Sequence, residues 1–413
     1  MLAIASGSLI GQVILAASTP LLSRLYPPES FGAFSLVLAI SAIVGPAATL
    51  KYEAALMLPK HEDDARRLLR LGMASAFAIS GLASLVVWVL AAAGLAPGWG
   101  EIAFAPLWVG GMTLATATFA VLTQAALRER SYATVARRSI SQSIGVVVGQ
   151  TLLGLVTPGP AGLLGGFLAG RCLGYAALFR AVRPLLKRPA EGSYRDLVRR
   201  YWRFPLVFMP SGLLNALGSQ LPLILIATWF GAASAGELAM AQRLVFIPVT
   251  LIGASIGEVF GAELSARIRG SLGENARLYL KTSLRMSYVA LLVVPVLLIA
   301  APAVLPFILG DLWPDSGLYA QAMAISVGLG LIATPVSKVF VTLQRSFPSI
   351  AVDISRLVLI GIAAWVAHSL DMSAIEATWL LYIAQGLNYV ITWLYGLRIV
   401  VQSDKQAAEG LIR

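Results

Sequence analysis

The sequence is poor in charged residues, cysteine and histidine. Only 12% of its 413 residues are charged and 58% are hydrophobic, whereas an ordinary soluble domain has about 25% charged and about 45–50% apolar residues. A soluble protein of this length has too little interior to bury so much apolar surface, so the sequence predicts a membrane protein. One cysteine, Cys172, excludes an internal disulfide, and with only two histidines we expect no metal site and no cofactor.

Catalytic motifs are also lacking. The sequence contains no Ser/His/Asp set, no phosphate-binding glycine loop with a lysine and no paired catalytic carboxylates. The glycines of Gly328-Leu329-Gly330 lie in an apolar run and are interpreted as packing residues. The sequence therefore predicts a protein that is not an enzyme.

Long apolar runs dominate the chain. A membrane-spanning helix needs about 20 mostly apolar residues, because each residue adds about 1.5 Å against a hydrocarbon core of about 30 Å. We therefore expect an all-α polytopic membrane protein with about twelve transmembrane helices. The runs cover 2–23, 32–50, 71–93, 102–127, 139–156, 161–179, 204–228, 236–260, 286–308, 317–342, 350–369 and 374–397.

Basic residues follow the alternation of the loops. The chain has 31 Lys and Arg against 20 Asp and Glu, a formal charge of +11. All basic residues fall in loops on one side of the expected membrane, except Arg24, Arg171, Arg243 and Lys338. By the positive-inside rule this side is cytoplasmic, with both termini there. Since no stacking aromatics are interleaved with these basic residues, the charge does not predict a nucleic-acid partner.

A basic segment at the middle of the chain separates two halves. We expect an N-terminal lobe of helices 1–6 (1–182), a cytoplasmic linker (183–203), a C-terminal lobe of helices 7–12 (204–398) and a cytoplasmic tail (399–413). An aromatic residue and Gly32 follow the first expected helix, as an aromatic pair and Gly236 follow the seventh. Related halves with a substrate site between them are typical of transporters.

Cations inside apolar runs are candidates for function, because a charge at the bilayer centre costs about 2.5–3.5 kcal/mol on insertion scales. Arg171 is expected near the middle of the sixth helix, Arg243 in the outer third of the eighth and Lys338 in the inner third of the tenth. With Arg24 and Lys51 at helix ends, they predict a cationic cavity. No carboxylate is expected at mid-membrane beside them, which favours an anionic substrate. The alternative is that these long side chains reach the membrane interface.

Amides and prolines of the seventh expected helix supply further candidates. Asn215 and Gln220 are expected to bind sugar hydroxyls, with interhelical hydrogen bonding as the alternative. Pro210 and Pro222 flank Asn215, and each removes a helical hydrogen bond. We expect them to act as hinges for movement of the lobes, with a fixed bend as the alternative.

Two blocks of sequence stand at equivalent places in the two halves. The first comprises 23–32 (SRLYPPESFG), 50–53 (LKYE) and 58–60 (LPK). The second comprises Phe204-Pro205, Pro210, 214–217 (LNAL), 220–222 (QLP), Phe230-Gly231, Gly236, 241–244 (AQRL), Pro248 and 257–260 (GEVF). Both blocks resemble bacterial polysaccharide biosynthesis proteins, the Wzx-type flippases.

This resemblance implies membership of the multidrug/oligosaccharidyl-lipid/polysaccharide exporter superfamily, with MATE-like architecture and two lobes facing a central cavity. It also implies alternating-access flipping of an undecaprenyl-diphosphate-linked oligosaccharide, the repeat unit of O-antigen or another surface polysaccharide or exopolysaccharide. The flipping would run from the cytoplasmic to the periplasmic leaflet of the bacterial inner membrane. The implied partners are the lipid-linked glycan, the lipid bilayer and polysaccharide polymerase machinery.

Two alternative functions stay open at this point: a multidrug or metabolite antiporter of the same superfamily, and a lipid II flippase. The energy source is also open, between a proton or sodium gradient and removal of the substrate on the far side.

Overall fold

The computed structural model describes residues 2–94, 102, 104–187, 192–270, 273–343 and 346–409. Residues 188–191 of the predicted linker and 410–413 of the predicted tail lie outside this range. The described residues form helices and no strand, which confirms the all-helical fold class. The chain divides into two compact units, Met1–Ala239 and Met240–Arg413, and the boundary between them falls inside one long helical stretch.

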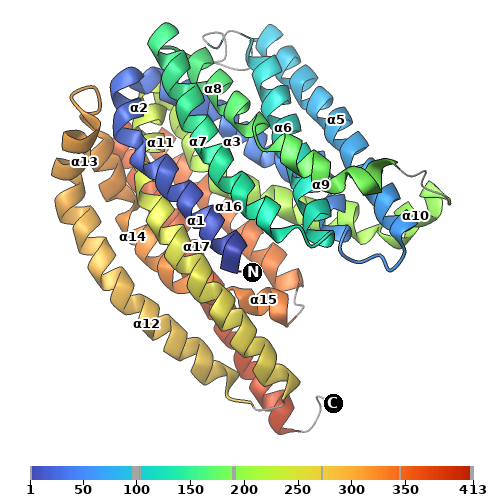
Figure 1. Ribbon diagram of the computed structural model, residues 1–413. Coiled ribbons are helices and arrows are strands. Elements are labelled where there is room, and N and C mark those ends of the chain that lie inside the picture. The colour runs from blue at the N-terminus through green and yellow to red at the C-terminus, as the bar shows by residue number, and fades with distance from the viewer. Residues whose placement is uncertain are drawn as a thin grey trace. The chain divides into compact units, whose positions relative to one another are not determined.

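Unit 1 contains the helices of the first half of the chain and the start of the second (Figure 1). They are α1 (Leu2–Ala17), α2 (Thr19–Leu25), α3 (Pro28–Ala48), α4 (Tyr52–Ala55), α5 (Glu62–Ala92), α6 (Ala105–Arg128), α7 (Tyr132–Val156), α8 (Pro160–Cys172), α9 (Tyr175–Lys187), α10 (Tyr194–Arg200), the π-helix η1 (Phe204–Phe208) and the first part of α11 (Met209–Arg269).

Unit 2 contains the rest of α11 and the helices that follow it. They are α12 (Asn275–Pro295), the π-helix η2 (Val296–Ala300), α13 (Ala301–Leu309), α14 (Ser316–Val336), α15 (Lys338–Thr342), α16 (Ser346–Ser369) and α17 (Ala374–Ala408). Pro295 precedes η2 directly. A proline cannot donate the helical hydrogen bond of its own residue, so the wider turn at this point has a local cause.

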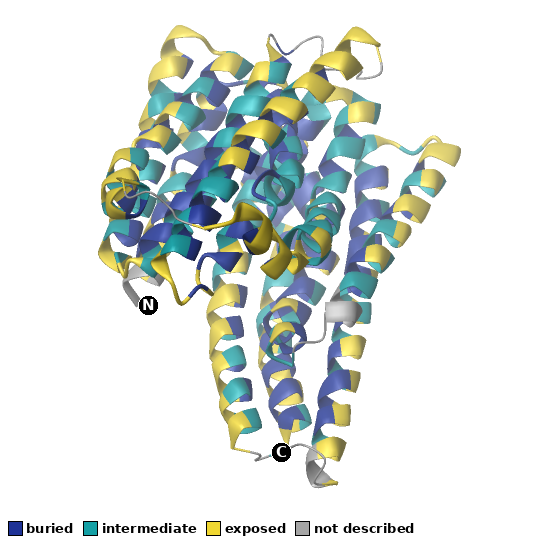
Figure 2. Ribbon diagram, turned by 90° about the vertical axis from the view of Figure 1, so that its right-hand side faces the viewer, coloured by how far each residue is buried: buried dark blue, intermediate teal, exposed yellow. Residues whose placement is uncertain are grey.

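Most of the long helices have the length and composition of membrane spans. Among the described residues, nine helices are long and apolar enough to cross a membrane, or up to ten if the bent pair α8 and α9 is one span. Each of the twelve predicted runs overlaps one or more helices, and the stretch Phe204–Arg269 contains two of the runs. Along the long helices, exposed residues gather on one side and buried residues on the other (Figure 2). The chain is therefore a multi-pass membrane protein, whereas the number of crossings stays a prediction.

Small residues allow α7 and α8 to pack backbone to backbone. A Cβ atom added at Gly149 would lie 2.7 Å from the carbonyl oxygen of Gly166, and one added at Gly145 would lie 3.1 Å from the Cα atom of Gly170. Glycines four residues apart on both helices thus form a contact that a larger side chain would separate. In this contact Gly166 and Gly170 act as packing residues and fix the end of α8, where Arg171 lies.

Gly231 interrupts α11, and its φ of 85° belongs to the left-handed region that glycine adopts without strain. The helix that resumes beyond this break crosses the start of α3. A Cβ atom at Gly32 would lie 2.7 Å from the carbonyl carbon of Ala232, and one at Gly236 would lie 2.6 Å from the carbonyl carbon of Pro28. The two glycines that the sequence aligns between the halves, Gly32 and Gly236, therefore lie where α3 and α11 cross. We call this contact the reciprocal crossing, because each glycine packs against the backbone of the other helix.

Candidate functional site: an arginine cluster in unit 1

Arg171 lies in the last turn of α8, where the helix ends at Cys172. The chain then bends by 41° before α9 begins at Tyr175. The sixth expected helix is therefore broken just after Arg171, which lies near the middle of the bent pair α8 and α9. A cation in the last turn is favoured by the partial negative charge of the free carbonyl groups there, so the break gives this arginine a local stabilising environment.

The guanidinium of Arg171 is held by a hydroxyl and an aromatic ring. Its Nη1 atom donates a hydrogen bond to Thr116 Oγ1 of α6 at 3.0 Å. Its Cζ atom lies 4.8 Å from the ring centroid of Phe167, one turn earlier on α8. The ring face carries negative electrostatic potential and attracts the cation without neutralising it.

Arg138 of α7 contacts the same helix as Arg171, because both side chains donate hydrogen bonds to threonines of α6. Its Nη1 atom donates to Thr123 Oγ1 at 2.6 Å, and its Cζ atom lies 3.7 Å from the ring centroid of Phe119. Gly174, in the break after α8, makes room for this side chain, because an added Cβ atom there would lie 2.7 Å from Arg138 Cγ. The two arginines form what we call the arginine cluster.

Three residues of α6 that contact the arginine cluster share one face of the helix. Thr116, Phe119 and Thr123 are spaced three and four residues apart, which places them in one row along the helix. Tyr175 at the start of α9 closes the row, since its hydroxyl donates to the carbonyl oxygen of Ala115 at 2.6 Å. Within the described ranges, no carboxylate forms an ion pair with either arginine of the cluster.

The other predicted cations of unit 1 lie apart from one another in the chain. Arg24 is exposed in the last turn of α2. Lys51 has a left-handed backbone, with φ of 60°, and its Nζ atom lies 3.8 Å from Glu53 Oε1. It also reaches α11, because a Cβ atom at Gly212 would lie 3.0 Å from Lys51 Cε. Asn215, exposed on α11, follows Gly212 by one helical turn, so Lys51 and this sugar-binding candidate are brought to the same part of unit 1.

The predicted cations of unit 2 differ from each other in environment. Arg243 is partly buried in α11 beyond the Gly231 break. Lys338 begins α15 after a one-residue interruption, and its Nζ atom lies 2.7 Å from Glu258 Oε1 of α11. The carboxylate partner of Lys338 stands 80 residues earlier in the chain. The expectation that no carboxylate lies at mid-membrane beside the predicted cations stays a prediction.

The remaining candidates lie along α11. Gln220 is partly buried, Pro210 stands in the first turn after η1, and Pro222 is buried in the helix interior. The non-helical backbone of α11 lies at Gly231. The hinge roles of the two prolines stay predictions.

Two carboxyl groups are more enclosed than the sequence indicates. Glu237 is 6% exposed, and Asp353 is 4% exposed. Asp353 lies 4.0 Å from Arg356 on the same helix. Buried carboxyl groups in apolar helices are candidates for ion coupling, and hydropathy did not distinguish these two from surface acids.

The fold is similar to that of solved membrane transporters. The structure is similar to that of the lipid II flippase MurJ in an inward closed conformation, with a TM-score of 0.69, 13% identity and coverage of 98% of this chain and 90% of that one. It is also similar to a MOP superfamily transporter from Pyrococcus furiosus, with a TM-score of 0.62, 14% identity and coverage of 98% of this chain and 96% of that one. A MATE transporter from Vibrio cholerae has a TM-score of 0.61 and 17% identity, with coverage of 97% of this chain and 96% of that one.

Residues 21–318 match the sequence profile of the polysaccharide biosynthesis protein family. Because the match covers most of the chain, this protein belongs to that family. A search of curated protein sequences finds no significant match.

Proposed function

We propose that this protein flips an undecaprenyl-diphosphate-linked oligosaccharide, the repeat unit of O-antigen or another surface polysaccharide or exopolysaccharide, by alternating access. The direction is from the cytoplasmic to the periplasmic leaflet of the bacterial inner membrane. The observation that carries the proposal is the arginine cluster, whose two cations are held by hydroxyl groups and aromatic rings in a member of the polysaccharide biosynthesis family.

The chemistry of a diphosphate fits this arrangement. A guanidinium group presents planar donors that bind phosphate oxygens in pairs, and charge-assisted hydrogen bonds of this kind are about twice as strong as neutral ones. Thr116 and Thr123 occupy one donor of each arginine, which orients the side chain and leaves other donors for a ligand. An unneutralised cation within an apolar bundle is costly, and a bound diphosphate would offset that cost.

The remaining predicted residues take supporting roles in this proposal. Arg24, Lys51, Arg243 and Lys338 supply further positive charge along the path of the substrate. Asn215 and Gln220 bind sugar hydroxyls, and Pro210 and Pro222 allow α11 to bend as access alternates. Coupling to a proton or sodium gradient completes the cycle.

Complementation of surface polysaccharide tests the proposal. In a strain lacking its own flippase, we expect the wild type to restore the polysaccharide and Arg138→Ala and Arg171→Ala to abolish it, although both variants reach the membrane at wild-type levels. Arg183→Ala is the control, since Arg183 is an exposed arginine of α9. Full polysaccharide in the Arg138→Ala/Arg171→Ala double variant would refute the cationic site.

The buried Glu237 favours one alternative, a multidrug or metabolite antiporter, because such a transporter needs an enclosed carboxyl group to bind cations or protons. Overexpression separates the two functions. Resistance to cationic drugs that is lost in Glu237→Gln, with no change in glycan, would establish the antiporter. The other alternative, a lipid II flippase, predicts that depletion is lethal, whereas loss of a dedicated surface polysaccharide leaves viable cells.

A further inference from the structure

A groove of about 990 Å³ lies between the last turns of α11 and the first turns of α12, within unit 2. Cations outnumber carboxylates along it. The charged lining residues are Arg267, Arg277, Lys281, Arg285, Glu263 and Glu274. The groove therefore complements a ligand with negative charge.

Two of the four cations are available to a ligand. Arg267 and Arg277 each pair with a glutamate of the groove, at 3.1 and 3.5 Å. Lys281 and Arg285 form no ion pair or hydrogen bond with the residues that the structure describes. They stand one helical turn apart on the same face of α12, where two like charges repel each other. An anion bound between them would replace that repulsion by attraction.

Two backbone amide groups at the start of α12 already have hydrogen-bond acceptors. The amide nitrogens of Asn275 and Ala276 donate to the two carboxylate oxygens of Asp404 of α17, at 2.9 and 2.8 Å. An anion in the groove would therefore be held by side chains. The same contact fixes the start of α12 against α17 and keeps the cations of the groove in place.

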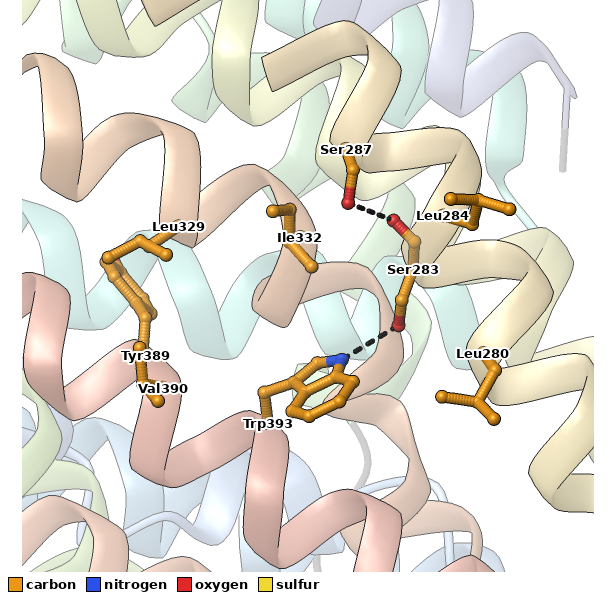
Figure 3. A pocket seen from close by; sticks show the side chains of 9 residues that line it. All are labelled: Leu280, Ser283, Leu284, Ser287, Leu329, Ile332, Tyr389, Val390 and Trp393. Atoms are coloured by element: carbon orange, nitrogen blue, oxygen red, sulfur yellow. Dashed lines mark hydrogen bonds between the residues drawn. The ribbon is translucent and has the colours of Figure 1, made fainter. Parts of the chain in front are cut away.

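An apolar pocket of about 380 Å³ adjoins the groove (Figure 3). Leu280 and Leu284, which are 46% and 56% exposed, line both spaces and form the ridge between them. Three polar side chains of the pocket are already hydrogen-bonded, because Trp393 Nε1 donates to Ser283 Oγ at 2.9 Å and Ser287 Oγ donates to the carbonyl oxygen of Ser283 at 3.0 Å. What the pocket offers a ligand is hydrocarbon surface from α12, α14 and α17.

We propose that these two spaces form one binding site for an anionic glycerophospholipid of the bilayer. The phosphate lies between Lys281 and Arg285, and a hydrocarbon chain passes over Leu280 and Leu284 into the apolar pocket. Basic pockets between transmembrane helices on the cytoplasmic side suit acidic lipid headgroups, and the positive-inside rule assigns this end of α12 to the cytoplasm. The site lies outside the arginine cluster and does not depend on the flipping function.

The lining chemistry favours a bilayer lipid over a lipid-linked sugar. Apart from the charged residues, the polar side chains that line the groove are those of Ser255 and Thr282. Recognition of a glycan requires a set of amides and hydroxyls that matches several sugar hydroxyls. A phosphate requires only the cations that are present.

Native mass spectrometry of the delipidated full-length protein tests the site. Phosphatidylglycerol and phosphatidylcholine with identical acyl chains are titrated separately. Since each basic residue contributes about 1 kcal/mol of attraction to acidic lipid, or about fivefold in affinity, we expect Lys281→Ala/Arg285→Ala to weaken phosphatidylglycerol binding about 25-fold. Binding of phosphatidylcholine should stay unchanged.

A matched control separates a site from general surface charge. Arg183→Ala/Lys187→Ala removes an exposed arginine and lysine with the same spacing from α9, and we expect wild-type binding. Equal losses in the two double variants, or equal affinity of the wild type for both lipids, would overturn the proposal. So would displacement of phosphatidylglycerol by undecaprenyl diphosphate at equimolar concentration, since the site would then belong to the carrier lipid.

A second measurement uses only a mild substitution. Phosphatidylglycerol brominated on its acyl chains should quench wild-type tryptophan fluorescence more than the Trp393→Phe variant, because Trp393 lines the apolar pocket. Brominated phosphatidylcholine should quench both proteins alike. Equal quenching of the two proteins by brominated phosphatidylglycerol would refute the placement of the hydrocarbon chain in the apolar pocket. This result does not depend on whether the alanine variants fold.

Discussion

Replacing Gly32 with alanine perturbs the reciprocal crossing of α3 and α11 in unit 1. The added methyl group would lie 2.7 Å from the carbonyl carbon of Ala232, and contacts of real Cβ atoms are almost never shorter than 3.0 Å. The obstacle is backbone and cannot rotate away. The carbonyl oxygen of Ala232 is closer still, so the two helices must separate by more than about 1 Å before the contact becomes ordinary.

The cost of this separation follows from the packing of the crossing. Overpacking a close-packed contact costs about 1–3 kcal/mol, which exceeds the gain of up to about 1 kcal/mol that alanine brings to a helix over glycine. Gly81→Ala is the matched control, because Gly81 lies inside α5 with no heavy atom within 4 Å of an added Cβ. We expect the Gly32→Ala protein in detergent to unfold at lower temperature than wild type and the Gly81→Ala protein at the same or higher temperature.

The equivalent change in the second half, Gly236→Ala, should cost a similar amount, since its methyl group would meet the backbone of Pro28. Because one separation of the helices relieves both clashes, the double variant should lose less stability than the two single variants together. Wild-type stability of Gly32→Ala, or strict additivity in the double variant, would refute the shared crossing.

Three further predictions concern single contacts. Gly166→Val should lower thermal stability by about 1–3 kcal/mol, because its Cβ atom would lie 2.6 Å from the Cα atom of Gln150; unchanged unfolding in detergent would contradict the α7–α8 packing. Ser373→Ala should cost about 1 kcal/mol in the same assay, since Ser373 and Glu376 cap the start of α17 with bonds of 2.7 and 2.9 Å; equal stability would show that the cap is not formed. Lys338→Glu should abolish surface polysaccharide and Lys338→Glu/Glu258→Lys should restore it; failure of the double variant would mean that the position of the cation matters, and not only the pairing.

The fold was predictable because lipid imposes strict lengths on its helices. A run of about 20 apolar residues has few other structures open to it, and every predicted run overlaps one or more helices. The pairing of Gly32 and Gly236 also carried structural information, since the two residues meet at one crossing. The break at Gly231 was hard to predict from the sequence. The backbone there has a positive φ, which glycine adopts without strain, but hydropathy does not report backbone angles.

The candidate site was predictable only in part. Arg171 stood out as a cation in an apolar run, whereas Arg138 was counted among the loop cations because the adjacent run was expected to begin at residue 139. In the structure α7 begins at Tyr132, and Arg138 packs on the ring of Phe119, beside Gly174. These contacts come from other helices, so no local pattern around Arg138 could show them. A search for basic residues within one helical turn of each run's end would have found it.

The sequence did not predict ion pairs between helices that are far apart in the chain, for the same reason. Lys338 and Glu258 belong to α15 and α11, and the salt bridge of 2.7 Å depends on how these helices pack. Both side chains are partly or largely exposed, 44% and 76%, so the pair contributes little to stability.

Translocation in proteoliposomes tests the central claim most directly. Vesicles are loaded on one leaflet with an undecaprenyl-diphosphate-linked oligosaccharide, and a lectin that cannot cross the bilayer measures its appearance on the other leaflet. We predict rapid translocation by the wild type and by Arg183→Ala, and translocation at the rate of protein-free vesicles by Arg138→Ala/Arg171→Ala. Wild-type rates in the double variant, or no translocation by the wild-type protein with this substrate, would contradict the account.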